Sequence, residues 1–334
     1  YNALSICLPD GGWMGECLCE DCRRLDPPNA PAATLNYPRA RVSYPYVSLS
    51  DRLMTFNNRV AEAVTAALPG KRLTMYIYSC YDEPPVRVRP HPSLVFLSAA
   101  GDYADANRYG WARRNMEGWS RFGNPLLWRP NAHMGFRQPV PQNYARRIFG
   151  DFETFKVNNL VGTDFDCIAG QWAASGLNYY VIAKGHLNPD RLGYDDILDD
   201  CCRAGFGAAA EKVKAYFTAL EAFTERAAAT GKGYDGYVGL YDGTEFERLL
   251  DAAAEAVKDD PGPRARVRFL RRALEFARAD QRLVAEWNAA PDDAAKHKAA
   301  QETYYRFVRQ QCREDPIATV PSSLGYWYSK YLRR

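Results

Sequence analysis

The sequence lacks a long apolar run and a strong charge of either sign. No stretch reaches the roughly 18 consecutive apolar residues of a membrane-spanning helix. The longest charge-free run, residues 167–183, contains Gln171, Asn178 and two glycines. A formal net charge of +3 over 334 residues is too small to indicate a nucleic-acid partner. We therefore expect a globular protein with no membrane-spanning segment and no nucleic-acid partner.

The sequence also lacks an initiator methionine and a basic-then-apolar leader. Because residues 3–8 already have the character of a strand, we expect this chain to have been cut from a longer one. A targeting signal would then lie upstream of Tyr1. An extracytoplasmic location, periplasmic or secreted, is favoured on this view, and the sequence leaves the oligomeric state open.

Cysteine is scarce, with nine residues in 334, which excludes a small disulfide scaffold. Three cysteines nevertheless crowd one loop as Cys17-x-Cys19-x-x-Cys22. The spacing suits thiolate ligands of zinc, but a four-ligand site would need a further ligand from elsewhere. Three interpretations stay open, ranked as a local disulfide, free structural thiols and zinc. We expect a cross-link or a metal to stiffen this loop.

Strand-like and helix-like segments alternate over residues 1–187. The expected strands are residues 3–8, 73–78, 94–98, 125–128 and 159–163. Crossovers of a dozen or more residues between them predict a parallel sheet. A long proline-rich loop is expected after residue 12, and Ser50 is expected to cap the helix that follows it. Spacings of three and four predict the apolar face of that helix as Leu53, Phe56, Val60, Val64 and Leu68.

Residues 188–334 change character, because Ala-rich amphipathic patterns replace the strand signals. Helices are expected over about 194–229 (broken near residues 205–207), 244–258, 263–288 and 292–313, with a weak strand at 237–241. The pattern predicts a helical bundle. The expected domains are therefore residues 1–187, an α/β domain, and residues 188–334, an all-α domain.

Five parallel strands fit either an open doubly wound sheet or most of an eight-stranded barrel. Neither G-x-G-x-x-G nor G-x-x-x-x-G-K-[ST] follows a strand, so nucleotide-binding doubly wound folds lose their main support. A barrel that lacks its first three strands would fit the early strand at residue 3. We therefore expect the chain to be incomplete as a barrel.

The opening segment is the most specific feature, with Asp10-Gly11-Gly12 after a strand and Cys17-x-Cys19-x-x-Cys22 after that. Further segments follow in order at residues 56–61, 73–78, 84–85, 90–92, 161–164, 177–180, 187–189 and 206–209. Together they resemble bacterial proteins carrying the domain of unknown function 4838. The resemblance implies a glycoside-hydrolase-like TIM barrel, similar to α-glucuronidases and β-hexosaminidase-type enzymes, with a helical region after it. The visible strands would then be the fourth to the eighth of the barrel.

Glycoside hydrolysis uses two carboxyl groups that flank the scissile bond, and barrel chemistry sits at the carboxyl ends of the strands. Asp10 and Asp164 each follow an expected strand and are the predicted catalytic pair. Asp82, Glu83 and Asp166 also follow strands and are predicted to bind substrate. For Asp10 the alternative is a turn before two glycines, for Asp82 and Glu83 a solvated loop, and for Asp164 a cap of the next turn.

Aromatic and cationic residues near strand ends are further substrate-binding candidates. Trp128, Arg129 and His133 sit at or just past one strand, and Tyr78 and Trp172 could stack on a sugar ring. Arginine binds carboxylates bidentately, so a uronic acid would suit such a site. The alternative for each aromatic residue is core packing, and for the histidine a structural role.

These patterns favour a glycoside hydrolase that acts on a polysaccharide or oligosaccharide, uronic-acid-containing substrates included. The resemblance predicts no cofactor. A non-catalytic carbohydrate-binding protein with the same cleft is the alternative, and a scaffold whose helical bundle binds another protein is a third hypothesis.

Overall fold

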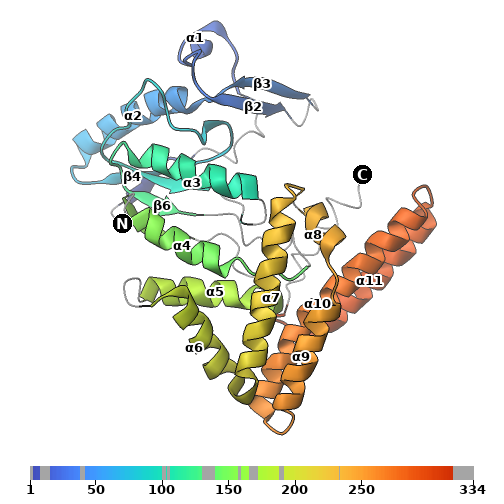
Figure 1. The fold of residues 1–334 in the computed structure, drawn as a ribbon. Coiled ribbons are helices and arrows are strands. Elements are labelled where there is room, and N and C mark those ends of the chain that lie inside the picture. The colour runs from blue at the N-terminus through green and yellow to red at the C-terminus, as the bar shows by residue number, and fades with distance from the viewer. Residues whose placement is uncertain are drawn as a thin grey trace. The chain divides into compact units, whose positions relative to one another are not determined.

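The computed structural model describes residues 3–7, 16–37, 42–99, 103, 106–129, 140–156, 159–164, 172–187, 192–232 and 234–318. The chain divides into two compact units (Figure 1). The first, here called the sheet unit, comprises residues 1–102, 108–132 and 154–166. The second, here called the helical unit, comprises residues 103–107, 133–153 and 167–334. The domain boundary expected after residue 187 stays a prediction.

The sheet unit is built on a parallel sheet whose five strands are paired in chain order. The strands are β1 (Ala3–Ser5), β4 (Arg72–Ile77), β5 (Leu94–Ser98), β6 (Leu126–Trp128) and β7 (Leu160–Thr163). Every neighbouring pair is parallel, and the order is β1-β4-β5-β6-β7. The parallel α/β sheet expected from the sequence is confirmed. A closed barrel is not shown by the described residues, which form an open sheet of five strands.

Two helices contact the same face of this sheet. Met75 of β4 is in register with Phe96 of β5, so both side chains lie on one face. Asn57 of α2 (Ser50–Ala67) donates to the Met75 Sδ at 3.1 Å. The ring of Trp119 in α3 (Ala106–Ser120) packs on Phe96 with centroids 4.7 Å apart. We call this the covered face.

The opposite face, here called the open face, carries the alternate residues of each strand. In β4 the buried residues are Leu73, Met75 and Ile77, and the residues between them are only partly buried. Tyr76 belongs to this second set, and Tyr78 follows in extended conformation with φ −160° and ψ 147°. The period of two therefore directs Tyr76 and Tyr78 to the open face.

Helix α2 forms where the sequence predicts it, but only part of the predicted apolar face is buried: Leu53 is buried, and Val60 and Val64 are half-buried. Phe56 is 58% exposed and Leu68 is 49% exposed, whereas Met54, Asn57 and Ala61 are completely buried. The sequence-based face was wrong in detail because buried Asn57 contacts a sulfur and so takes the place of an apolar residue. Ser50 does not cap the helix. Its hydroxyl reaches the carbonyl of Glu83 instead.

The long proline-rich loop expected before α2 contains regular structure. It holds a short helix, α1 (Glu20–Arg23), and an antiparallel hairpin of β2 (Ala32–Tyr37) and β3 (Val42–Val47). Pro45 lies inside β3 opposite Thr34. A two-stranded sheet has only edge strands, and proline is tolerated there because its missing N–H need not pair. Sequence analysis predicts a loop here because proline is usually unfavourable in a strand.

The helical unit contains most of α4 (Ala145–Lys156), whose residues from 154 onward belong to the sheet unit. It also contains α5 (Trp172–Leu187), α6 (Tyr194–Phe206), η4 (Gly207–Ala209), α7 (Ala210–Ala229), α8 (Tyr234–Leu240), α9 (Thr244–Ala256), α10 (Pro261–Ala289) and α11 (Ala294–Glu314). The mostly helical C-terminal part is confirmed, with the break between α6 and α7 at Gly207. Among the described residues, no helix has the length and apolarity needed to cross a membrane.

The weak strand expected at 237–241 is wrong, since this segment lies mainly in α8. Tyr237 is fully buried, and its ring packs edge-on against Phe223 of α7 with centroids 5.9 Å apart. Phe223 also contacts the rings of Tyr241 and Phe246. Burial of aromatic rings in a helical core overrides the local strand preference of the sequence.

Gly118 in α3 supports a close contact with the loop that follows β4. A Cβ at this position would lie 2.7 Å from Cγ of Pro84, and a proline ring cannot rotate away. We predict that Gly118→Ala lowers the free energy of unfolding by about 1–3 kcal/mol through overpacking. Chemical denaturation checks this.

Gly110 in the same helix provides the matched control. A Cβ there would meet only the mobile end of Arg114, at 3.5 Å. Gly110→Ala should be neutral or stabilise by up to about 1 kcal/mol through helix propensity. Equal effects of the two variants would contradict the packing argument.

Candidate functional site at the carboxyl ends of the strands

Arg129 and Asp164, two of the residues predicted from the sequence, meet at the carboxyl ends of β6 and β7. Arg129 Nε lies 3.4 Å from Asp164 Oδ2. The Arg129 guanidinium carbon also lies over the ring of Tyr76, 5.0 Å from its centroid. The Arg129 side chain is 18% exposed and that of Asp164 is 57% exposed. The Asp164 carboxylate is therefore accessible to solvent, and the Arg129 guanidinium contacts both the Tyr76 ring and this carboxylate.

The backbone ladder positions these two side chains. The amide of Arg129 donates to the carbonyl of Ser98 at 2.9 Å. The amide of Asp164 donates to the carbonyl of Trp128, also at 2.9 Å. Both bonds continue the parallel ladder one residue beyond the assigned strands. Arg129 consequently extends β6 with its side chain on the open face, where Tyr76 lies. The alternative role of Asp164 as the cap of a turn stays open.

Trp128 takes the covered face and not the open one. It is in register with Ser98 and is 1% exposed. Because its neighbour Arg129 points the other way, the two residues do not share a surface. The structure thus places Trp128 in the core of the sheet unit, the alternative that the sequence left open.

The loop that carries Asp82 and Glu83 is anchored and half-buried. Trp119 Nε1 and Asn115 Nδ2 each donate to the carbonyl of Asp82 at 2.8 Å. Trp111 Nε1 donates to Oε1 of Glu83 at 2.7 Å. These contacts come from α3, so they fix the loop to the sheet unit. Both residues remain partly exposed, and the bonds from α3 to Asp82 reach its backbone carbonyl, so the alternative of a solvated loop stays open for its carboxylate.

A buried carboxylate holds the next part of the same loop. Asp51, which is 1% exposed at the start of α2, accepts the amides of Val86, Arg87 and Val88 at 2.7–2.8 Å. Three backbone donors satisfy the charge of a carboxylate that burial would otherwise disfavour. The sequence analysis did not single out Asp51. Its position in the first helical turn would be the only local signal.

Five of the residues predicted from the sequence remain to be placed. Asp10, His133 and Asp166 lie outside the described residues. Trp172 begins α5 of the helical unit, is 42% exposed and packs edge-on against Tyr179. Tyr78 is half-buried just after β4.

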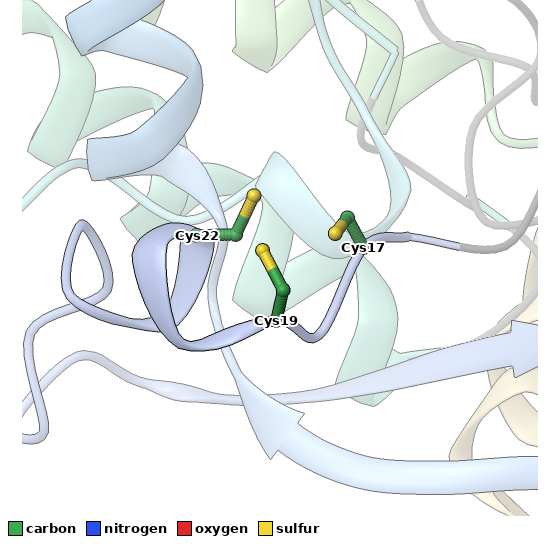
Figure 2. Close-up of side chains that lie close together, drawn as sticks. All are labelled: Cys17, Cys19 and Cys22. Atoms are coloured by element: carbon green, nitrogen blue, oxygen red, sulfur yellow. The ribbon is translucent and has the colours of Figure 1, made fainter.

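The second site is the cysteine loop. The sulfur atoms of Cys17, Cys19 and Cys22 all lie within 4.8 Å of one another. Figure 2 shows the three side chains converging from the segment before α1, from its N-cap and from the helix itself. Cys17 and Cys19 are exposed and Cys22 is half-buried, and none of the described cysteines is in a disulfide.

The thiols of Cys19 and Cys22 differ in acidity because they share hydrogen bonds. The pKa of Cys19 is lowered, chiefly by the backbone amide of Cys22 and then by the neighbouring thiols. The pKa of Cys22 is raised to about 11, mainly because its thiol is hydrogen-bonded to Cys19 and then to Cys17. By contrast, burial raises the pKa of Cys80 to about 12. The loop therefore exposes the thiols of Cys17 and Cys19 to solvent, whereas Cys80 is a core thiol.

A buried ion pair fixes the cysteine loop to α2. Arg52 donates to both carboxylate oxygens of Asp26, and Tyr46 Oη donates to the same carboxylate at 3.0 Å. The Asp26 side chain is 1% exposed and that of Arg52 is 14% exposed. Burial alone would lower the pKa of Arg52, but the bonds and charge of Asp26 outweigh it and raise the pKa. Arg52 Nη1 then holds the carbonyl of Cys17 at 2.7 Å.

We predict that Asp26→Ala destabilises the sheet unit by about 3–5 kcal/mol, since it leaves a half-buried guanidinium without its carboxylate. Urea denaturation of the full chain, followed by circular dichroism, measures the change. The control is Asp21→Ala in the same segment, which removes only an exposed pair with Arg24. That variant should leave stability nearly unchanged. A mild Asp26→Ala phenotype would show that the ion pair does not anchor the loop.

The comparisons with known proteins agree with the resemblance expected from the sequence. The model of one family, Domain of unknown function (DUF4838), matches residues 3–218. No curated protein and no solved structure matches the chain. The matched span covers the whole parallel sheet, the cysteine loop and the helices up to α7, which is more than half of the 334 residues. The chain therefore belongs to the DUF4838 family.

Proposed function

We propose that this protein is a glycoside hydrolase that acts on a polysaccharide or oligosaccharide, uronic-acid-containing substrates included. The observation that carries the proposal is the solvent-exposed carboxylate of Asp164, held by Arg129 at the carboxyl end of a parallel sheet whose strands run in chain order. Carbohydrate would bind on the open face, at the edge where barrel enzymes have their active sites.

The strand order supports a barrel over a doubly wound sheet. A doubly wound sheet reverses its strand order at a switch point, whereas here β1, β4, β5, β6 and β7 follow one another without reversal. Right-handed crossovers between strands in this order place every connecting helix on one face. The contacts of α2 and α3 with the covered face fit that pattern. We propose that the five strands belong to a (β/α)8 barrel whose interior is the open face.

The sheet edges support the same proposal. Leu4 of edge strand β1 is 43% exposed, and Val161 of edge strand β7 is 64% exposed. Exposed apolar residues on unpaired edge strands are an aggregation hazard that barrel closure removes. Further strands paired with β1 and β7 would bring neighbouring side chains beside both residues and reduce their exposure.

The chemistry requires two carboxyl groups, one to donate a proton and one to act as base or nucleophile. Asp164 is the described member of the proposed pair, and Asp10, which follows β1, is the other. Adjacent strands lie about 4.8 Å apart, so β1 and β7 would be roughly 19 Å apart in a flat sheet. Catalytic carboxyl pairs are separated by about 5–10 Å. The Asp10–Asp164 pair therefore depends on the curvature that barrel closure supplies.

Arg129 would act as a positioning residue in this proposal. Its contacts with the Tyr76 ring and with Asp164 restrict the carboxylate to the open face. Tyr78 lies two residues after Tyr76 and is directed to the same face. Its partly exposed ring offers a surface against which the apolar face of a sugar could pack.

Carbohydrate binding without hydrolysis is the second candidate. The same Arg129–Asp164 pair favours it, because a guanidinium and a carboxylate side by side offer donors and acceptors to vicinal hydroxyl groups. Calorimetry with oligosaccharides and product analysis on the same samples separate the two functions. Binding without any released sugar would support this candidate and overturn hydrolysis.

The test of hydrolysis is a screen of the full-length protein against plant and host glycans, with uronic-acid-containing polymers among them. On the substrate found, Asp164→Asn and Asp10→Asn should each lower kcat by about 10²–10⁴-fold, as expected for loss of a proton-transfer group. Asp292→Asn, an exposed carboxylate in the helical unit, is the matched control and should keep full turnover.

Thermal melting establishes that each variant is folded. Folded Asp164→Asn protein with wild-type turnover would remove Asp164 from the mechanism and direct attention to Asp82 and Glu83. Loss of turnover in Asp164→Asn alone would support its role while rejecting Asp10 as the partner.

A further inference from the structure

The cysteine loop holds three potential soft ligands at one point of the surface. The sulfur atoms of Cys17, Cys19 and Cys22 lie within 4.8 Å of one another. A tetrahedral zinc ion with Zn–S bonds of about 2.3 Å separates its sulfur ligands by roughly 3.8 Å. Movements of about 1 Å, available to side chains that are exposed or half-buried, would close the set around one ion. We propose that Cys17, Cys19 and Cys22 bind a zinc ion through three thiolates, with solvent as the fourth ligand.

The ligand chemistry favours a soft metal ion. Thiolates prefer zinc and copper(I) to magnesium or calcium. Three protein ligands and one open position are a common zinc arrangement. Binding would form three Zn–S bonds and release the thiol protons to solvent, so no oxidant or reductant is required.

Hydrogen bonds from two arginine side chains fix the backbone of the cysteine loop. Arg52 Nη1 binds the carbonyl of Cys17 at 2.7 Å, and Arg23 Nε binds the carbonyl of Leu18 at 2.8 Å. Arg52 is itself fixed by the buried carboxylate of Asp26. Two guanidinium groups thus set the path of the backbone between the first and second ligands, and preorganisation of this kind lowers the cost of binding.

The charge of the site points the same way. Zinc with three thiolates carries one net negative charge, and the guanidinium group of Arg23 at the Leu18 carbonyl would offset it. Three thiolates within 4.8 Å of one another would repel, so a shared cation is what allows all three thiols to lose their protons together.

A local disulfide is the rival occupant of the loop. It would join two of the sulfur atoms, leave the third unpaired and need an oxidant. All three sulfur atoms converge in the structure (Figure 2), and this threefold arrangement suits a metal ion better than a bond between two of them. The zinc proposal is independent of the proposed hydrolase activity.

The experiment uses the full chain, purified under reducing conditions without chelator. Elemental analysis should find about one zinc per chain, and replacement by cobalt(II) should produce thiolate-to-cobalt charge-transfer absorption. Cys17→Ser, Cys19→Ser and Cys22→Ser should each weaken zinc affinity by about 100-fold or more in chelator competition. The controls Cys7→Ser and Cys312→Ser should leave the affinity unchanged.

Three results would overturn the proposal. These are three free thiols that bind neither zinc nor cobalt, a Cys–Cys disulfide in the native protein by mass spectrometry, and wild-type zinc affinity in all three loop variants. Circular dichroism reports whether the variants fold. Should a serine variant unfold, the cobalt spectrum of the wild-type protein decides the question by itself.

Discussion

Pairing of the strands in chain order is the constraint on which the sheet unit depends. Once β1, β4, β5, β6 and β7 are parallel neighbours in that order, right-handed crossovers send the connecting helices to one side. The covered face then becomes core: Met75 contacts α2, Phe96 contacts α3, and Trp128 on the same face is 1% exposed. The open face keeps partly exposed tyrosines and charged groups. The division between core and site follows from topology before any individual side chain is considered.

Buried carboxylates hold the loops around that sheet. Asp51 collects three amides of the segment after β4, and Asp26 holds Arg52, which reaches the cysteine loop. In each case a charge that would be costly to bury is satisfied by several donors. Such anchors allow irregular segments to keep one conformation, which a binding or catalytic site requires.

The candidate site shows where sequence reasoning succeeds and where it stops. Arg129 and Asp164 were identified because each follows a strand, and parallel strands bring their carboxyl ends to one edge. The same rule selects Trp128, yet this residue is buried, because residues adjacent in a strand point to opposite faces. The pairing register tells which residues share a face, and the contacts of α2 and α3 tell which face is covered. The roles of Trp111 and Trp119 as anchors of the Asp82–Glu83 loop were equally invisible, since the partners lie 28 and 37 residues apart.

The sequence by itself determined the local features of this protein. Hydrophobic period and β-branched runs located the five parallel strands and most helices, and two short intervals brought Cys17, Cys19 and Cys22 into one loop. Tertiary structure alone decided the rest. It selected Asn57 and Ala61 over Phe56 for the buried side of α2, turned residues 237–240 into helix, and joined Asp26 to Arg52 across 26 residues. Local propensities act over a few residues, whereas burial and charge pairing depend on which distant segments meet, and that is settled only when the chain packs.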